Sequence, residues 1–308
     1  MKILYISSGN SGAVNIIVKN QAESLKNLGA EVSSYLIRGR GIRGYLKHIF
    51  LLRKYLRNNK FDLYHAHYSF SGFTAAMAGC RPLVVSLMGS DTYSAGLFRL
   101  LIRFFSHRIW RQTIVKSEGM REALGLDAAI ILPNGVDTGV FHPADRTAAR
   151  KELGLPENQK IILFIADPSR PEKNFQLART SLDRLNDQNT ILLPVYNTSH
   201  TMIPLYMNAG NVLLLTSLWE GSTNVVKEAM ACELPVVSTD VGDIKRNIGK
   251  LKGCFIAEPD PEQIAAGLSQ ALAFSGETGG RERLSELGLD APSVAGKLMD
   301  IYTKMIDN

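Results

Sequence analysis

The sequence predicts an α/β protein made of two doubly wound, Rossmann-like domains that face each other across a cleft. Its 308 residues suit two domains of about 150 residues better than one core. Short aliphatic runs alternate with longer helical patterns, which is typical of parallel sheets covered by helices, and the second half of the chain repeats this plan. Ligands of such sheets bind at the carboxyl ends of the strands, so both sheets are expected to contribute to the cleft.

The N-terminal domain is expected to span residues 1–145. Its first helix covers residues 13–28, because Ile16, Ile17, Leu25 and Leu28 recur at helical spacing and Gly29 is placed to end the helix. Its strands are expected at residues 2–6, 31–36, 62–66, 83–87, 113–116 and 129–132.

A linker is expected at residues 146–157, ahead of a C-terminal domain at residues 158–290. The turn signature Pro133-Asn134-Gly135 ends the first series of strands, and Pro143 and Pro156 bracket a polar segment without strand character. A second series of strands follows at residues 160–166, 190–195, 211–215, 235–238 and 253–256, and a last helix at about 293–306 has no strand after it.

Composition favours a globular cytoplasmic protein. Hydrophobic residues make up 45% and charged residues 21%, which excludes fibrous and disordered classes. The longest apolar runs are strand-sized, well short of the ~20 residues of a membrane span, and the run after Met1 is too short for a signal-peptide core. Three scattered cysteines, Cys80, Cys232 and Cys254, fit reduced thiols in the cytosol.

The positive charge is concentrated in the first half of the chain. Residues 1–145 hold 18 Lys and Arg against 9 Asp and Glu, whereas residues 146–308 hold 17 against 20. Residues 38–60 carry eight basic residues and no acid among apolar ones, and residues 97–110 repeat this pattern. It is typical both of a helix on an anionic membrane surface and of a solvated helix that packs its apolar side inward. Peripheral attachment to the inner face of the membrane therefore remains an option.

The richest polar segment follows the strand at residues 211–215. Gly221, Ser222, Thr223 and Asn224 precede a helix, and the backbone N–H groups of a helix start attract phosphate. Glu228 lies one turn into that helix and would reach back toward two neighbouring hydroxyls, as on a ribose. Glu220 precedes the helix and could address sugar hydroxyls; for both carboxylates, capping and salt bridging are the alternatives.

Two further loops carry candidate residues. Arg170 and Lys173 follow the strand at residues 160–166, where two cations could neutralise a leaving diphosphate or could form a solvated charge pair. The loop at residues 7–13 holds Gly9 and Gly12, which permit close backbone approach to a ligand. It lacks the G-x-G-x-x-G spacing, so a Rossmann dinucleotide site is not supported.

The segment from Glu220 to Glu228, continued through residues 231–243, resembles the signature of glycosyltransferase family 4. So do Pro133-Asn134-Gly135-Val136-Asp137 with Phe141-His142-Pro143, and Pro171-Glu172-Lys173. The resemblance covers nearly the whole chain. It implies the GT-B fold, a retaining transfer from a nucleotide-sugar, a C-terminal helix at residues 291–308 that packs back toward the N-terminal domain, no cofactor and no bound metal.

The resemblance also implies roles for individual residues. Glu228 would hold the ribose hydroxyls, and Glu220 would contact the donor sugar. Lys173 and Arg170 would stabilise the leaving group. The diphosphate would lie at the start of the helix, and the remaining donor-binding residues would be Gly12, Ser222, Thr223, Asn224 and Val225.

Three departures from the family pattern affect these roles. Ala166-Asp167 stands where the family has Gly-Arg, so Arg170 has to supply the second cation. Met88-Gly89-Ser90-Asp91 lacks the usual His, which leaves Asp91 as the acceptor-side candidate. Pro194-Val195-Tyr196-Asn197 replaces a glycine-rich loop, so base recognition is unassigned, and Tyr196 packs either on a base or in the core.

His65 and His67 end the third strand and are further candidates for the acceptor side, or for a metal pair. Side chains alternate along a strand, so both point the same way only if the strand continues to residue 67.

The function expected from these observations is retaining transfer of a sugar from a nucleoside-diphosphate sugar, UDP- or GDP-linked, to an acceptor hydroxyl. A lipid-linked or surface-polysaccharide precursor is the favoured acceptor, and nucleic acid is not an expected partner. The alternatives are a nucleotide-sugar epimerase of the same two-domain plan and a non-catalytic protein that binds nucleotide or membrane. The sugar and the oligomeric state are not encoded in these motifs.

Overall fold

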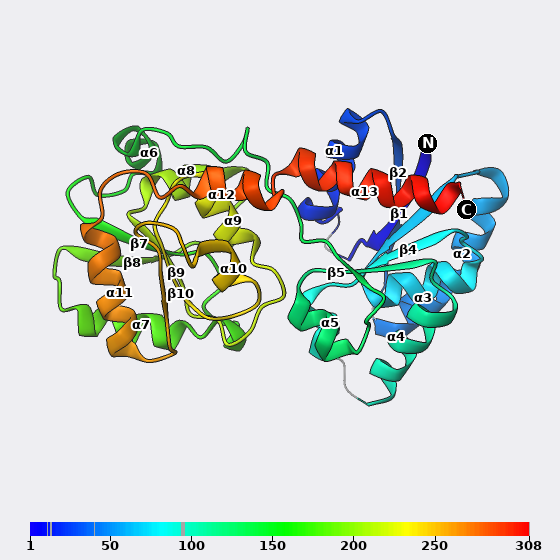
Figure 1. The fold of residues 1–308 in the computed structure, drawn as a ribbon, viewed down its shortest axis with the longest axis horizontal. Helices are drawn as coiled ribbons and strands as arrows, with labels where there is room; N and C mark the ends of the chain where they lie inside the picture. The colour runs from blue at the N-terminus through cyan, green and yellow to red at the C-terminus, as the bar shows by residue number, and fades with distance from the viewer. Residues whose placement is uncertain (11, 13, 40, 94–95, 308) are drawn as a thin grey trace. The chain divides into compact units, whose positions relative to one another are not determined.

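The computed structural model describes residues 1–307 except residues 11, 13, 40, 94 and 95. The chain divides into two compact units (Figure 1). Unit 1 comprises residues 1–135 together with residues 291–308, and unit 2 comprises residues 136–290. The chain therefore passes from one unit to the other twice.

Unit 1 is built on a six-stranded sheet in the order β2-β1-β3-β4-β5-β6, in which every paired strand is parallel. The strands are β1 (Lys2–Ser8), β2 (Glu31–Ile37), β3 (Leu63–His67), β4 (Leu83–Ser86), β5 (Gln112–Val115) and β6 (Ile130–Ile131). The helices are α1 (Ile16–Asn27), α2 (Gly41–Asn58), α3 (Ser69–Ala78), α4 (Leu97–Arg108), α5 (Glu118–Leu124) and α13 (Ala291–Ile306), and a short 3-10 turn covers Gly89–Tyr93.

Unit 2 is built on a five-stranded parallel sheet in the order β11-β10-β9-β7-β8. The strands are β7 (Lys160–Phe164), β8 (Thr190–Pro194), β9 (Val212–Leu215), β10 (Val236–Thr239) and β11 (Phe255–Ala257). The helices are α6 (Arg146–Leu153), α7 (Phe175–Leu185), α8 (Ile203–Ala209), α9 (Asn224–Ala231), α10 (Ile244–Ile248), α11 (Pro261–Ala273) and α12 (Gly280–Leu287), with 3-10 turns at Pro171–Lys173 and His200–Met202.

The predicted α/β class and the predicted strands are confirmed. Each of the eleven expected strands is present, with ends that differ by one or two residues. The first helix begins later than expected, at Ile16, because the side chain of Asn15 accepts a hydrogen bond from the backbone N–H of Ile17 at 3.0 Å and caps it. Residue 13, where the helix was expected to begin, lies outside the described residues.

The segment expected as a linker, residues 146–157, is an ordered part of unit 2. The guanidinium of Arg150 is buried and donates to the carbonyls of Ala209 and Glu157 at 2.9 and 2.7 Å, and to the side chain of Asn211 at 2.6 Å. These bonds fix α6 and the chain after it to the sheet. The first segment of unit 1 accordingly ends at Gly135, eleven residues before the start of the predicted linker at residue 146.

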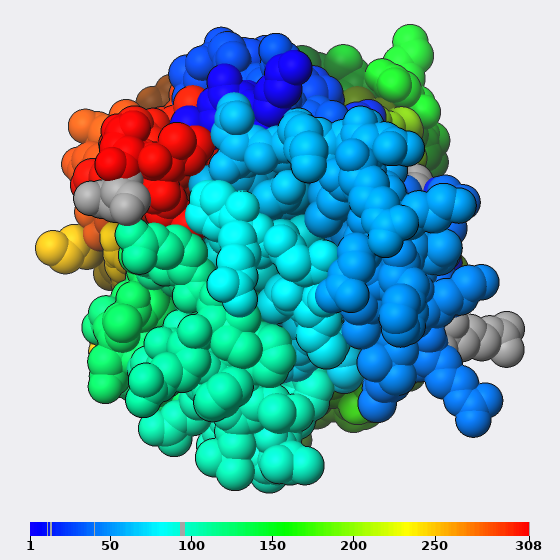
Figure 2. Space-filling view, turned by 90° about the vertical axis from the view of Figure 1, so that its right-hand side faces the viewer, coloured from blue at the N-terminus to red at the C-terminus, as the bar shows by residue number. Residues whose placement is uncertain are grey.

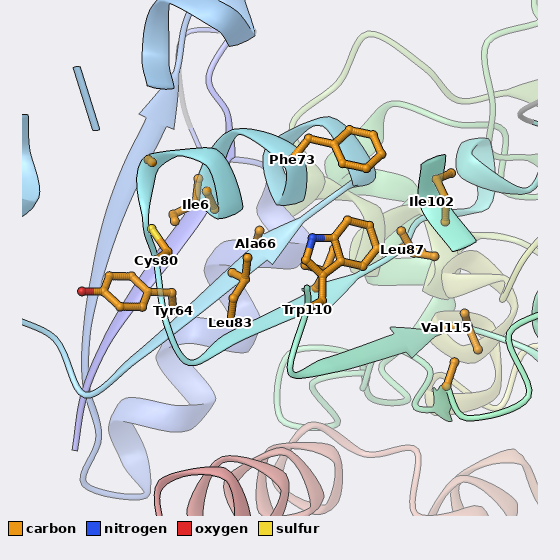
Figure 3. Packing of buried hydrophobic residues seen from close by; sticks show 14 of the residues in the cluster. Ile6, Tyr64, Ala66, Phe73, Cys80, Leu83, Leu87, Ile102, Trp110 and Val115 are labelled. Atoms are coloured by element: carbon orange, nitrogen blue, oxygen red, sulfur yellow. The ribbon is translucent and has the colours of Figure 1, made fainter. Parts of the chain in front are cut away.

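One face of the unit 1 sheet is covered by α2, α3 and α4. Figure 3 shows buried residues of this cluster from close by, among them Ile6, Phe73 and Trp110. Trp110 packs beside Phe73, with ring centroids 5.6 Å apart. A glycine is required beneath them, because a Cβ on Gly72 would lie 2.9 Å from the side chain of Val85 and 3.0 Å from that of Trp110. Close packing of α3 on the sheet thus depends on this one small residue.

The other face of this sheet is covered by α1 and the C-terminal helix α13. Val294, Leu298 and Tyr302 of α13 pack against residues of β1 and α1. The hydroxyl of Tyr302 hydrogen-bonds to Nδ1 of His65 and lies 3.2 Å from the hydroxyl of Tyr5. All three side chains are fully buried, so the last helix completes a polar cluster inside unit 1.

The two basic, apolar stretches predicted from the sequence form α2 and α4. Both helices bury some apolar residues, such as Leu52 and Ile102, but leave others in contact with solvent: Phe50 is 73% and Leu97 is 74% exposed. Within the described part of the chain, no helix carries an apolar stretch long enough to cross a bilayer.

The buried hydroxyl of Tyr302 is expected to contribute to stability. Tyr302→Phe leaves Nδ1 of His65 without its partner in a dry environment, so we expect the free energy of unfolding to fall by about 1–3 kcal/mol in urea denaturation. Tyr196→Phe is the matched control, because Tyr196 is 47% exposed, and its effect is expected within about 0.5 kcal/mol. Equal stability of both variants would show that the cluster contributes nothing.

Candidate functional site

Four loops of unit 2 leave the sheet at the carboxyl ends of adjacent strands. They follow β7, β8, β9 and β10, which are neighbours in the sheet. Because all pairs are parallel, these loops emerge at one edge. The predicted residues Lys173, Glu220 and Glu228 all belong to this edge, and the structure adds His200 and Asp243 to it.

Lys173 and Glu220 form an ion pair across two of these loops. Their side chains are only 14% and 16% exposed. Ser217 donates a second hydrogen bond to the Glu220 carboxylate at 2.8 Å, and the hydroxyl of Thr216 donates to the backbone carbonyls of Lys173 and Asn174 at 3.0 Å. The pair is therefore held in place by the end of β9 and is largely shielded from water.

Arg170 does not join this pair in the structure. Its guanidinium donates to the Glu172 carboxylate at 2.8 Å and its side chain is 54% exposed. Asp167, at the departure from the family pattern, accepts hydrogen bonds from the backbone and hydroxyl of Ser169 at 2.9 and 2.7 Å. The loop is thus organised by its own turn, and Arg170 is engaged with its neighbour instead of with Glu220.

Glu228 has a partner that the sequence analysis did not identify. Nε2 of His200 lies 3.0 Å from the Glu228 carboxylate, which is 13% exposed. The hydrogen bond to Glu228, reinforced by the charge of that carboxylate, raises the pKa of His200 above its ordinary value. The only hint to His200 in the sequence was its position after a predicted strand. No motif indicated its contact with Glu228.

The start of α9 carries a compact polar network. Ser222 and Thr223 both donate to the carboxylate of Asp243, at 2.7 and 3.3 Å, and Nζ of Lys227 donates to the Ser222 hydroxyl at 3.1 Å. Lys227 is 1% exposed, and burial lowers its pKa to about 8. Asn224 and Val225 are the first residues of the helix. The first turn of a helix has backbone N–H groups without intrahelical carbonyl partners, which suits an anion.

A glycine is required where the Asp243 loop approaches the α9 loop. Gly242 has φ +61°, and a Cβ there would lie 2.8 Å from the carbonyl oxygen of Gly221. Any larger residue would push the two loops apart. Asp243 was part of the resembling segment, but its role as an anchor for Ser222 and Thr223 was not predicted.

In unit 1, Gly12 and Asp91 occupy different environments. Gly12 has φ +89°, and a Cβ there would meet no described atom within 4 Å, so the loop is open at this point. Asp91 is fully buried: it accepts hydrogen bonds from the backbone of Met88 at 2.7 Å and of Ser69 at 3.4 Å, and burial raises its pKa to about 6. These bonds join two loops of unit 1, and the acceptor-side role expected for Asp91 stays a prediction.

His65 and His67 point to the same side of β3, because the strand continues to residue 67 and their rings stack with centroids 4.3 Å apart. His65 is 0% and His67 is 4% exposed. Both ring nitrogens of His65 are bonded, one to Tyr302 and the other to Ser86 at 2.8 Å. Burial, followed by the charge of Lys116, lowers the pKa of His67 to about 3. Both histidines are thus buried and neutral, and the acceptor contact expected for them stays a prediction.

Two other open points concern Tyr196 and metal ligands. Tyr196 is 47% exposed in the loop after β8, so it does not belong to the core. Among the residues that the structure describes, no three or more His, Cys, Asp or Glu side chains gather in a way that could hold a metal ion.

Two family models match the chain. The model described as Glycosyltransferase Family 4 matches residues 13–140, and the model described as Glycosyl transferases group 1 matches residues 158–273. Together they cover most of both units.

Curated relatives are similar over parts of their length. TuaC of Bacillus subtilis, a glycosyltransferase named for teichuronic acid biosynthesis, is 26% identical over 68% of this chain and 61% of its own. The chain thus spans about three fifths of TuaC. D-inositol 3-phosphate glycosyltransferase 2 of Catenulispora acidiphila is 25% identical over 80% of this chain and 72% of its own.

Solved structures share the fold over the whole chain. Sucrose-phosphate synthase of Thermosynechococcus elongatus superposes with a TM-score of 0.84 at 17% identity, covering 100% of this chain and 99% of its own. Anabaena HepE in complex with UDP and glucose has a TM-score of 0.76 at 17% identity, covering 98% and 99%. Both likenesses show the two-domain GT-B fold. The two family models, which match residues 13–140 and 158–273, show that this chain belongs to the glycosyltransferases of the family 4 and group 1 type.

Proposed function

We propose that this protein transfers a sugar, with retention of configuration, from a nucleoside-diphosphate sugar to an acceptor hydroxyl. The observation that carries the proposal is the Lys173–Glu220 pair, shielded from water beside the start of α9 and the His200–Glu228 pair. At one sheet edge, a cation and a helix start suit the diphosphate of such a donor. The two carboxylates suit the hydroxyls of its sugar and of its ribose. HepE, which has the same fold, was solved with UDP and glucose.

In the proposed reaction, Lys173 and the first turn of α9 stabilise the departing diphosphate. The bond between the anomeric carbon and the diphosphate oxygen breaks, and its electron pair remains on that oxygen. The acceptor hydroxyl attacks from the face being vacated and its proton passes to the leaving oxygen. Because Lys173 is only 14% exposed, its charge is weakly screened by water and acts strongly on the developing anion. Arg170 would assist only after leaving Glu172.

Glu220 and Glu228 bind the two ends of the donor in this proposal. Glu220 takes sugar hydroxyls while it stays near Lys173. Glu228 takes the ribose hydroxyls, and we assign His200 a positioning role, because its hydrogen bond fixes the Glu228 side chain before the donor arrives. Ser222, Thr223 and Asn224, together with the backbone of Val225, complete the proposed donor site of unit 2 at the start of α9. No bound metal is needed for these steps, so EDTA is expected to leave the transfer rate unchanged.

The proposed acceptor is a lipid-linked or surface-polysaccharide precursor at the inner face of the membrane. The exposed apolar residues of α2 and α4 lie among basic ones, which favours an anionic membrane surface over a purely solvated helix face. TuaC is named for the biosynthesis of such a surface polymer. Uridine and guanosine remain the candidate bases.

Donor binding is expected to depend on Glu228. In a thermal-shift screen of nucleoside diphosphates and their sugar conjugates, one nucleotide is expected to raise the melting temperature by several degrees, because it binds only the folded state. Glu228→Ala should lose this shift. Glu262→Ala is the control, since Glu262 forms an exposed pair with Arg184. No shift with any nucleotide would contradict the proposal.

Turnover is expected to depend on Lys173. Lys173→Ala should lower the release of nucleoside diphosphate, with the donor found in the screen, by about 10²–10³-fold, since one stabilising group for the leaving oxygen is lost. Lys160→Ala is the matched control, because Lys160 pairs with Asp187 at the opposite end of β7 and should leave the rate unchanged. Donor consumption that proceeds without any acceptor would instead indicate an epimerase, and donor binding without turnover would indicate a binding protein.

The positioning role of His200 predicts a pH dependence. The folded protein raises the pKa of His200, so the stabilisation from its pair with Glu228 is complete below pH 6.5 and is lost as the pH rises through the raised pKa. The difference in unfolding free energy between wild type and His200→Gln should shrink over that interval, and His200→Gln should weaken the nucleotide-induced thermal shift. A difference that stays constant from pH 6 to pH 9 would rule out this pair as the cause.

A further inference from the structure

A pocket of about 320 Å³ lies between α2, α3 and α4 of unit 1. It is separate from the residues assigned above to donor binding. Its volume is at the small end of the range for ligand pockets, which suits a slender occupant. Figure 2 looks at the side of the molecule on which α2, in blue, and α4, in green-blue, come to the surface.

The floor of the pocket is aromatic. Phe70 and Phe98 have ring centroids 4.6 Å apart, and Phe73 and Phe105 have centroids 4.7 Å apart. Thr74 also lines the pocket, but its hydroxyl donates to the backbone carbonyl of Tyr45 at 3.4 Å. The described side chains of the floor thus offer an occupant apolar contact and little hydrogen bonding, which selects for hydrocarbon.

The rim of the pocket is apolar and open to solvent. Ile42, Leu46, Met77 and Leu101 line it and are 61%, 49%, 41% and 39% exposed. On α2 and α4, next to these rim residues, Phe50, Leu97, Leu100 and Phe104 are also exposed. Apolar surface gathered in this way around a pocket is typical of a site that is covered by a partner.

The charge around this surface is of one sign. Exposed basic side chains accompany the apolar ones on α2 (Arg43, Lys47, Lys54 and Arg57) and on α4 (Arg103 and Arg108). Residues 41–60 and 97–111 contain no Asp or Glu. The complementary partner therefore combines hydrocarbon with negative charge, as an anionic lipid does.

Tyr45 connects the pocket to the carboxyl edge of the unit 1 sheet. Its ring lines the pocket and stacks on Phe70 with centroids 5.1 Å apart. Its hydroxyl is hydrogen-bonded to Ser8 at the end of β1, and burial together with the nearby carboxylate of Asp91 raises the pKa of Tyr45 and of Tyr68. Tyr68 follows β3 directly and has φ +84°, an uncommon conformation that is frequent at functional sites. One end of the pocket thus meets a cluster of hydroxyl groups.

We propose that this pocket holds the hydrocarbon chain of the acceptor itself, a single-chain anionic amphiphile whose polar head lies at Tyr45 and Tyr68. The chain would be gripped by the aromatic floor, and the anionic group would be met by the basic residues of α2 and α4. This assignment rests on the proposed transferase function, but the binding that it describes can be measured without donor or turnover.

The test uses decyl phosphate, below its micellar concentration, as the probe in isothermal titration calorimetry with the full chain. Saturable binding of one molecule is expected, and butyl phosphate, with the same head and a short chain, should bind at least tenfold more weakly. Leu101→Trp places a larger ring at the rim and should weaken decyl phosphate binding at least tenfold. Leu28→Trp is the matched control: it is the same substitution at a 48% exposed residue at the end of α1, outside the pocket and outside α2 and α4, and should retain binding within about twofold.

Two results would overturn the proposal. Absence of saturable decyl phosphate binding, or equal weakening by both substitutions, would show that the pocket does not take a chain. A parallel sedimentation assay with phosphatidylglycerol vesicles distinguishes the source of the chain. If Leu101→Trp loses vesicle binding as well, while Leu28→Trp keeps it, the pocket serves bulk lipid and not the acceptor. Retained vesicle binding with lost decyl phosphate binding is the result expected.

Failure of the transferase function gives a different result. In that case the nucleotide-induced thermal shift is absent from the wild type and from both tryptophan variants, whatever their affinity for decyl phosphate. If the transferase proposal holds and only the pocket assignment fails, the nucleotide shift is present in all three proteins and the chain-length dependence is missing.

Discussion

The structure depends on one constraint of parallel sheets: the polar loops that follow the strands all emerge at the same edge. In unit 2 this constraint brings the loops after β7, β8, β9 and β10 together, although they are separated in the sequence by whole helices. Backbone N–H and C=O groups inside the sheet hydrogen-bond to neighbouring strands. The side chains in the loops at the strand ends are therefore the groups available for a ligand. The Lys173–Glu220 and His200–Glu228 pairs are the direct result.

The same constraint works differently in the two units. At the edge of unit 2 the polar residues meet in half-shielded ion pairs, where a ligand can compete for them. In unit 1 the polar residues near the strand ends are drawn inward: His65, His67 and Asp91 are buried, and the Tyr302 hydroxyl comes from the far end of the chain to satisfy His65. Burial there favours the neutral forms of the histidines and raises the pKa of Asp91, so these groups contribute buried hydrogen bonds to unit 1.

Sequence periodicity was sufficient to predict the strands, because a buried strand is recorded locally as a run of aliphatic residues. Position next to such runs singled out Lys173, Glu220 and Glu228 as candidates, and the resemblance to glycosyltransferase family 4 gave them their proposed roles. Sequence periodicity could not predict partners. His200 lies 28 residues from Glu228, Tyr302 lies 237 residues from His65, and neither pair has a local pattern that indicates contact. The exposure of these helices could not be predicted either. Amphipathic spacing identified α2 and α4 as helices with an apolar side, but only the packing in the folded protein decides how much of that side remains in contact with water.

The course of the chain through the two units has a consequence for its synthesis. Residues 1–135 leave the ribosome first, but α13, which covers one face of their sheet, is made last. Until then, β1 and β3 expose an apolar face and His65 lacks its Tyr302 partner. Unit 2 is encoded without interruption, so it can reach its native packing while unit 1 still waits for its final helix. Helix α13 thus completes the cover of this face only after unit 2 has been synthesised, and a chain that stalls before residue 291 would present a partly uncovered sheet to chaperones and proteases.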